Sequence, residues 1–186
     1  MDTKTRIRIS FTALLILSLV AFAGAAITIL NITEWTVRAK YPPIVKVRGA
    51  DAVNTSYIYT RVTHGFATDG TNRTYITITG FRGDPTKYDE ILKICNLDNV
   101  SYDVSLVYNG TVTGGWTYVK WVKFWIANQG PLTITGTGSS GSAVTTIPAG
   151  QCASVAVEVL VSGNLPDNML GQDILTIAIN VKSVKP

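Results

Sequence analysis

Histidine is nearly absent from this chain of 186 residues, and its scarcity limits the chemistry that the chain can perform. His64 is the single histidine, so a Ser-His-Asp relay could be built in only one way, and neither Gly-x-Ser-x-Gly nor His-Glu-x-x-His accompanies it. The adjacent carboxylates Asp89 and Glu90 would point to opposite faces of a strand, which does not suit paired acid–base work. Residues 69–72, Asp-Gly-Thr-Asn, offer oxygen atoms to calcium but have no acidic cluster beside them. The sequence therefore predicts a protein that is not an enzyme and binds no metal or cofactor.

Cysteine is also scarce, since the chain contains only Cys95 and Cys152. Two cysteines and one histidine cannot supply the four ligands of a structural zinc site. In an oxidising exterior an even pair is bridged more often than free. A bridge here would close a loop of roughly 58 residues and remove about 4 kcal/mol of chain entropy from the unfolded state. We therefore predict a structural disulfide between these two residues.

Helical periodicity is missing after Leu30, where no stretch shows helical spacing over ten residues. Short runs rich in β-branched and aromatic residues alternate with turn residues instead. This pattern predicts eight or nine strands and an antiparallel β-sandwich, with a closed barrel as the alternative. The expected strands span residues 44–47, 57–62, 74–79, 88–97, 102–108, 116–126, 155–161 and 175–182.

Two segments between these strands carry strong local signals. Asn109-Gly110 is the sequence typical of a tight turn between two strands, so we expect a hairpin there. Residues 130–146 are mostly Gly, Ser and Thr, which predicts an exposed, mobile hairpin or loop. His64 lies between Thr63 and Gly65, where we expect an exposed loop.

The N-terminal region has the layout of a secretory signal. Lys4, Arg6 and Arg8 precede an apolar run, and small residues gather at its end. We therefore expect a signal peptide over residues 1–25, with cleavage after Ala25 and with Ala23 as the second choice. An uncleaved anchor is the alternative, because roughly 20 apolar residues can span a bilayer. If the signal peptide is cleaved, the membrane is a partner of the protein only during export.

Removal of this segment changes the charge of the chain. Residues 1–25 contain Lys4, Arg6, Arg8 and Asp2, so 13 basic and 11 acidic residues remain and the net charge falls from +4 to +2. A value this close to neutral argues against nucleic acid as a partner, because phosphate binding needs a clustered basic face.

Asn-x-Ser/Thr sequons are frequent in the chain. In an exported protein, five such sites favour a surface coat of covalent N-glycans. The five asparagines are Asn31, Asn54, Asn72, Asn99 and Asn109.

Two longer stretches resemble a known family. Residues 147–159 read Ile-Pro-Ala-Gly-Gln-Cys and then alternating valines, and residues 168–181 read Asn-Met-Leu-Gly-Gln-Asp and then a second alternating strand. Together with residues 92–106, a strand that ends in Asn and is soon followed by another, this pattern resembles the TasA/camelysin family. The archaeal bundling pilins and thread filament subunits are most similar. The cysteine pair and the tryptophan-rich strand are not part of the family pattern.

The resemblance implies an exported, jelly-roll-like β-sandwich that polymerises into surface fibres, with identical subunits as partners and with bundling between fibres. Camelysin has been regarded as a metalloprotease, but this chain has no cluster of metal ligands that would carry such an activity. The implied function is therefore assembly.

Donor-strand exchange is the mode of assembly that suits the sequence. We expect residues 26–40 to form an N-terminal strand that completes the sheet of the next subunit, and residues 41–186 to form the sandwich. Residues 27–32 would dock in the neighbour and residues 35–39 would rejoin their own domain. The apolar side chains of this strand are Ile27, Ile29, Leu30, Ile32, Trp35 and Val37.

A second function remains open at the level of sequence. A glycosylated sandwich held by an uncleaved helix could serve as a cell-surface binding or adhesion module. Its contact residues for sugars or another protein would be Trp116, Trp121 and Trp125.

Overall fold

A computed structural model describes residues 11–16, 33, 36–52, 61–66 and 72–186. The chain divides into two units, Met1–Lys40 and Tyr41–Pro186. In the first unit, residues 11–16 are helical, and residues 36–40 have no regular secondary structure. Val37 of the predicted donor strand is exposed there. The remaining predicted donor residues lie outside the described residues: Ile27, Ile29, Leu30, Ile32 and Trp35.

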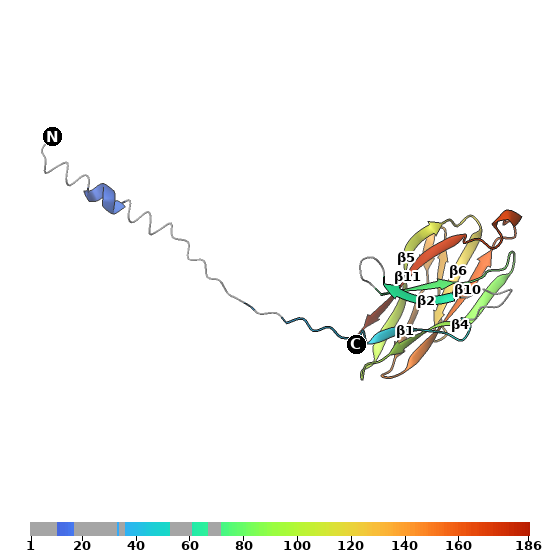
Figure 1. Ribbon diagram of the computed structural model, residues 1–186, viewed down its shortest axis with the longest axis horizontal. Helices are drawn as coiled ribbons and strands as arrows, with labels where there is room; N and C mark the ends of the chain where they lie inside the picture. The colour runs from blue at the N-terminus through green and yellow to red at the C-terminus, as the bar shows by residue number, and fades with distance from the viewer. Residues whose placement is uncertain (1–10, 17–32, 34–35, 53–60, 67–71) are drawn as a thin grey trace. The chain divides into compact units, whose positions relative to one another are not determined.

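The second unit is an antiparallel β-sandwich, as the sequence predicts (Figure 1). One layer is a six-stranded sheet in the order β1-β4-β10-β6-β7-β8. Its strands are β1 (Ile44–Arg48), β4 (Pro85–Asn96), β10 (Cys152–Val161), β6 (Val119–Ile126), β7 (Gln129–Thr135) and β8 (Gly138–Ser140).

The facing layer consists of two separate pieces. One is a three-stranded sheet in the order β11-β5-β9, formed by β11 (Leu175–Val184), β5 (Tyr102–Gly114) and β9 (Ala143–Ile147). The other is the hairpin of β2 (Arg61–Phe66) and β3 (Asn72–Thr77). Val62 in this hairpin and Ile78 just after it pack against the common core. A short 3-10 helix, η1 (Asp167–Met169), precedes β11.

The central strand β10 shows why the chain folds in this way. Val155, Val157, Val159 and Val161 are all buried, because every second side chain of a strand points to the same face. They pack on the inner face with Ile94 of β4 and Ile126 of β6, both of which are fully buried. Strict alternation along the sequence therefore places the hydrophobic core between the two layers.

The predicted hairpin at Asn109-Gly110 is wrong, because β5 runs straight through both residues. The register with β11 shifts at this point, since Thr111 lies opposite Ile177 while Tyr108 lies opposite Ile179. Gly110 has a φ of 104°, which side chains rarely adopt, so the dipeptide forms a bulge. Pairing with the C-terminal strand overrides the local turn preference.

Residues 130–146, predicted as an exposed, mobile hairpin or loop, do contain a hairpin, which β7 and β8 form, and the segment is not an irregular loop. Most of the segment lies in β7, β8 and β9. Leu132, Ile134 and Ala143 are buried, so a few apolar side chains among the many small polar ones anchor these strands to the core. His64 likewise lies in β2 and not in a loop, although its side chain is exposed as expected.

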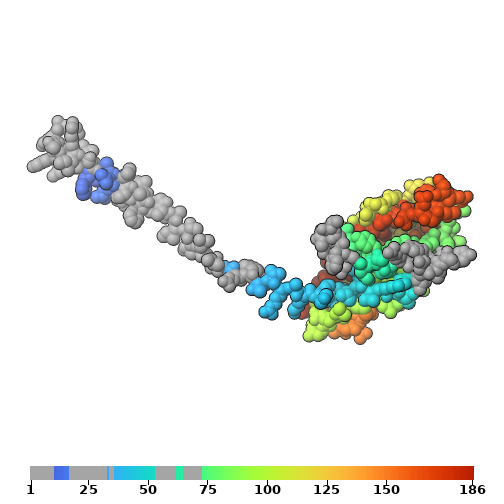
Figure 2. Space-filling model, in the orientation of Figure 1, coloured from blue at the N-terminus to red at the C-terminus, as the bar shows by residue number. Residues whose placement is uncertain are grey.

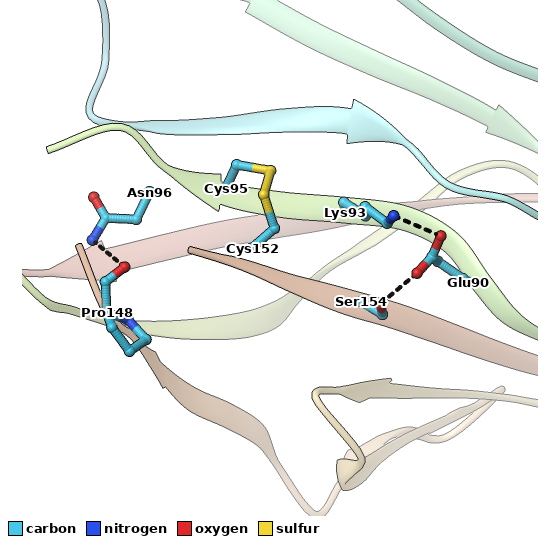
Figure 3. The surroundings of a disulfide bond; sticks show 7 residues. All are labelled: Glu90, Lys93, Cys95, Asn96, Pro148, Cys152 and Ser154. Atoms are coloured by element: carbon cyan, nitrogen blue, oxygen red, sulfur yellow. Dashed lines mark hydrogen bonds and ion pairs between the residues drawn. A yellow bond between two sulfur atoms is a disulfide. The ribbon is translucent and has the colours of Figure 1, made fainter. Parts of the chain in front are cut away.

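A bulge in β4 is held by the segment that follows β1. Gly49 N and Asp51 N donate to the carbonyls of Ile91 and Glu90, at 3.2 and 3.0 Å. The Glu90 carboxylate accepts hydrogen bonds from Ala50 N at 3.0 Å and, as Figure 3 shows, from Ser154 Oγ at 2.7 Å. A Cβ at Gly49 would lie 2.0 Å from the Glu90 carbonyl oxygen, so only glycine allows this approach.

These contacts predict a pH-dependent contribution from Glu90. Hydrogen bonds from Ser154, Lys93 and the Ala50 N–H lower the pKa of Glu90 below its ordinary value of 4.5. A depressed pKa in the folded state means that the stabilisation is present above the unfolded pKa and is lost as the pH falls through the folded pKa. We expect Glu90→Gln to lower stability at about pH 7 and the deficit to shrink towards about pH 3.

Chemical denaturation across this range measures the effect. The matched control is Asp173→Asn, which changes an exposed carboxylate beyond the sheet and is expected to alter stability little. A Glu90→Gln deficit of the same size at both pH values would contradict the proposed role of the carboxylate.

Candidate functional site

A further strand could add to a sheet at its edge strands. In the part of the chain that the structure describes, β1 and β8 border the large sheet, and β9 and β11 border the small one. β8 has only three residues, Gly-Ser-Ser, and β1 and β9 have five each. β11 has ten residues and is therefore the longest open edge.

The two edge strands of the small sheet, β9 and β11, differ in how deeply their inward side chains are buried. On β9, Ala143 and Ile147 are 0 % and 1 % exposed. On β11, the inward side chains pack against the core but are only partly buried, and these are Leu175, Ile177, Ile179 and Val181. The space-filling view shows the start of β11, in orange-red, at the surface (Figure 2).

The interrupted layer explains this difference. β11 pairs with β5, and β2 pairs with β3, but no ladder joins these two pieces among the described residues. The six-stranded sheet therefore faces a layer whose strands are not continuous. A strand that added to β11 would gain main-chain partners and would cover the half-buried side chains of that strand.

The predicted disulfide between Cys95 and Cys152 is confirmed (Figure 3). The two residues lie opposite each other on β4 and β10, with their Cα atoms 4.0 Å apart. The bond thus links two neighbouring central strands of the large sheet. A disulfide is consistent with an extracellular location.

The described sequons occupy different settings. Asn99 is exposed in a bend between β4 and β5, where its N–H donates to Asp98 Oδ1 at 2.8 Å. Asn109 is exposed at the bulge of β5. Asn72 begins β3, while Asn31 and Asn54 lie outside the described residues.

The three tryptophans considered as contact residues separate into two groups. Trp116 is half-buried before β6 and packs against the core. Trp121 and Trp125 alternate with the inward residues of β6 and face outward. Lys123 Nζ lies 3.9 Å from the ring centroid of Trp121, and Lys87 Nζ lies 5.7 Å from that of Trp125, so lysine side chains lie over both rings.

Asn96, the asparagine that ends the strand noted in the sequence, is a buried polar residue whose hydrogen bonds the sequence did not predict. Its side chain is 0 % exposed, and Nδ2 donates to the carbonyls of Val100, Ile147 and Pro148 at 2.7, 3.0 and 3.1 Å. Oδ1 accepts from Asp98 N at 3.0 Å. The end of β4 is thereby fixed to the turn before β10 (Figure 3). A strand that ends in Asn-x-Asp is the signal that could have indicated this side-chain-capped turn.

The polar side chains in the clusters of the described region are engaged in hydrogen bonds and ion pairs with one another. Ser154 Oγ donates to Glu90, and the same carboxylate accepts from Lys93 at 3.1 Å, so its lone pairs are engaged. His64 Nδ1 lies 3.0 Å from Thr74 Oγ1 across the β2–β3 ladder. Asp89 pairs with Lys87 at 2.8 Å on the surface. Across the described residues there is no group of three or more His, Cys, Asp and Glu that could hold a metal ion.

Searches with the whole sequence found no family model and no curated protein that match the chain. Within the described ranges, no helix combines the length and the apolar content needed to cross a membrane.

Proposed function

We propose that this protein is an exported structural subunit of an extracellular pilus or fibre, which polymerises head-to-tail by donor-strand complementation. The observation that carries the proposal is the open edge of β11, ten residues long and with partly buried apolar side chains on its inner face. The occupant is the N-terminal strand, residues 26–40, of a second copy. The resemblance to the archaeal bundling pilins and thread filament subunits supports the same assignment.

The energetics favour a durable joint. Four apolar side chains of the donor, each worth about 1.5 to 3 kcal/mol when buried, would enter the interface together with a ladder of main-chain hydrogen bonds. In an extended strand Ile27 and Ile29 share one face and Leu30 and Ile32 share the other, so burial of all four requires cover on both faces of the donor. Each subunit donates at one end and accepts at another, so the contact does not close and generates a filament.

The proposed subunit also carries N-glycans and has lost its signal peptide by cleavage. Asn99 and Asn109 are exposed, so covalent glycans on them would point into solvent. The disulfide suits an oxidising exterior. Contacts between fibres would produce bundles.

Deletion of residues 26–40 from the exported protein tests the proposal. We expect folded, soluble monomers in place of fibres when the product is imaged by electron microscopy. Fibres of unchanged appearance would overturn donor-strand assembly.

Complementation in solution sharpens this test. A synthetic peptide of residues 26–40, added at about 100 times its Kd, should stabilise the deletion variant by about 2.7 kcal/mol and raise its Tm by several degrees. A peptide with the same residues in scrambled order is the matched control and should leave the Tm unchanged.

A further inference from the structure

The sequon at Asn109 is built into the sandwich, unlike the one at Asn99. Thr111, the third residue of the sequon, lies opposite Ile177 in the β5–β11 ladder. Its hydroxyl accepts a hydrogen bond from Trp116 Nε1 at 3.0 Å and lies 3.1 Å from the Tyr108 hydroxyl. The strand and two aromatic side chains therefore hold this threonine.

The sequon at Asn99 differs in lying outside the β-ladders, although its Val100 carbonyl accepts a hydrogen bond from Asn96 Nδ2 at 2.7 Å. Its sequon, Asn99-Val100-Ser101, follows the end of β4 and precedes the start of β5, so it belongs to no strand. The side chain of Asn99 is exposed in a bend. A transferase can approach such a bend without opening a ladder.

Glycan transfer requires access to the whole acceptor sequence. The Ser/Thr hydroxyl is part of the sequon, so an enzyme that modifies the asparagine must also reach that hydroxyl. Asn109 and Thr111 are both exposed, but the Thr111 hydroxyl contacts Trp116 and Tyr108 and the sequon lies within the β5–β11 ladder. An enzyme that binds this sequon must displace these contacts and open the pairing on both sides of the bulge, where Tyr108 faces Ile179 and Thr113 faces Thr176. Opening of such a segment has a free-energy cost that lowers the population able to react.

We infer that Asn109 can be glycosylated only before β11 pairs with β5, whereas Asn99 remains open to modification in the folded protein. This inference rests on the proposed N-glycosylation of the exported subunit. β11 begins at Leu175, well after β5 in the sequence, so the Asn109 sequon cannot pair with it until residues 175–184 have been exported. A glycan at Asn109 would therefore have been attached during export, before the chain folded.

The test uses full-length protein produced without glycans and folded with its disulfide intact. It is incubated with an oligosaccharyltransferase and a lipid-linked oligosaccharide, and the occupancy of each site is followed by mass spectrometry. Peptides of residues 95–103 and 105–115 serve as unfolded references. We expect both peptides to be modified, and the folded chain to be modified at Asn99 at least about tenfold faster than at Asn109.

A variant that opens the ladder provides the matched comparison. Ile177→Pro removes a backbone N–H opposite Thr111 and should raise modification at Asn109 while the rate at Asn99 stays unchanged. Equal rates at the two sites in the folded wild-type chain would overturn the inference, even if the variant folds poorly. If neither peptide is modified, N-glycosylation itself fails, and the assembly proposal is still judged by the deletion of residues 26–40.

Discussion

Replacement of Ile179 by aspartate should abolish fibres and leave the sandwich folded. Ile179 is partly buried on the inner face of β11, so in the single subunit an aspartate there keeps contact with water. When a donor strand covers this face, the carboxylate must lose its hydration without gaining a partner. A penalty of about 3 kcal/mol would weaken each joint roughly 100-fold, and the loss recurs at every subunit.

Electron microscopy and light scattering after size-exclusion chromatography measure this outcome. Asn180→Asp is the matched control, because Asn180 is the next residue and lies on the exposed face of the same strand. Thermal melting of both variants distinguishes lost assembly from lost folding, and Val181→Ser offers a milder change on the inner face. Normal fibres from a folded Ile179→Asp variant would exclude β11 as the acceptor.

Replacement of Asn96 by leucine should lower the free energy of unfolding by about 3 kcal/mol. Leucine has a similar size but leaves the carbonyls of Val100, Ile147 and Pro148 without their shared donor. Buried polar groups that lose a partner cost about 1–3 kcal/mol each, which outweighs the apolar gain. Denaturant unfolding of the disulfide-bonded protein gives the value.

Two further variants identify the cause of this loss. Asn96→Asp keeps the acceptor for Asp98 N but turns a carboxylate towards the carbonyl oxygens, so it should be destabilised at neutral pH and partly recover in acid. Asn168→Leu changes an exposed asparagine and should alter stability by less than about 0.5 kcal/mol. A leucine at position 96 that costs as little as one at position 168 would show that the amide network contributes nothing.

The strands that could be predicted from the sequence are those in which inward-facing and outward-facing residues alternate strictly. β10 and β11 show it, and the cysteine pair could be matched because it had no other partner. β7, β8 and β9 could be predicted only as an exposed hairpin or loop, because Gly, Ser and Thr dominate their sequence and only scattered residues such as Leu132 and Ile134 are buried. Local composition carries no information on which distant strand will cover a segment.

Of the candidate site, only the N-terminal donor segment could be predicted from the sequence. The apolar N-terminal stretch is visible in the sequence, but the acceptor depends on which strand lies at the border of a sheet. β11 and β9 both flank β5, and only the structure shows that the inner face of β11 is the less covered. The role of Asn109-Gly110 was missed for the same reason, since its partner strand lies more than sixty residues away.

The position of the disulfide determines where a mechanical load would travel. Val45 of β1 lies opposite Cys95, and Cys95 lies opposite Cys152. A pull on the chain at Tyr41 reaches β1 first and then β4, and the covalent bond transmits it directly into β10 at the centre of the large sheet. Tension that enters through β1 is thus carried into the middle of the sandwich, and β4 cannot begin to separate from β10 at the Cys95–Cys152 end of their ladder.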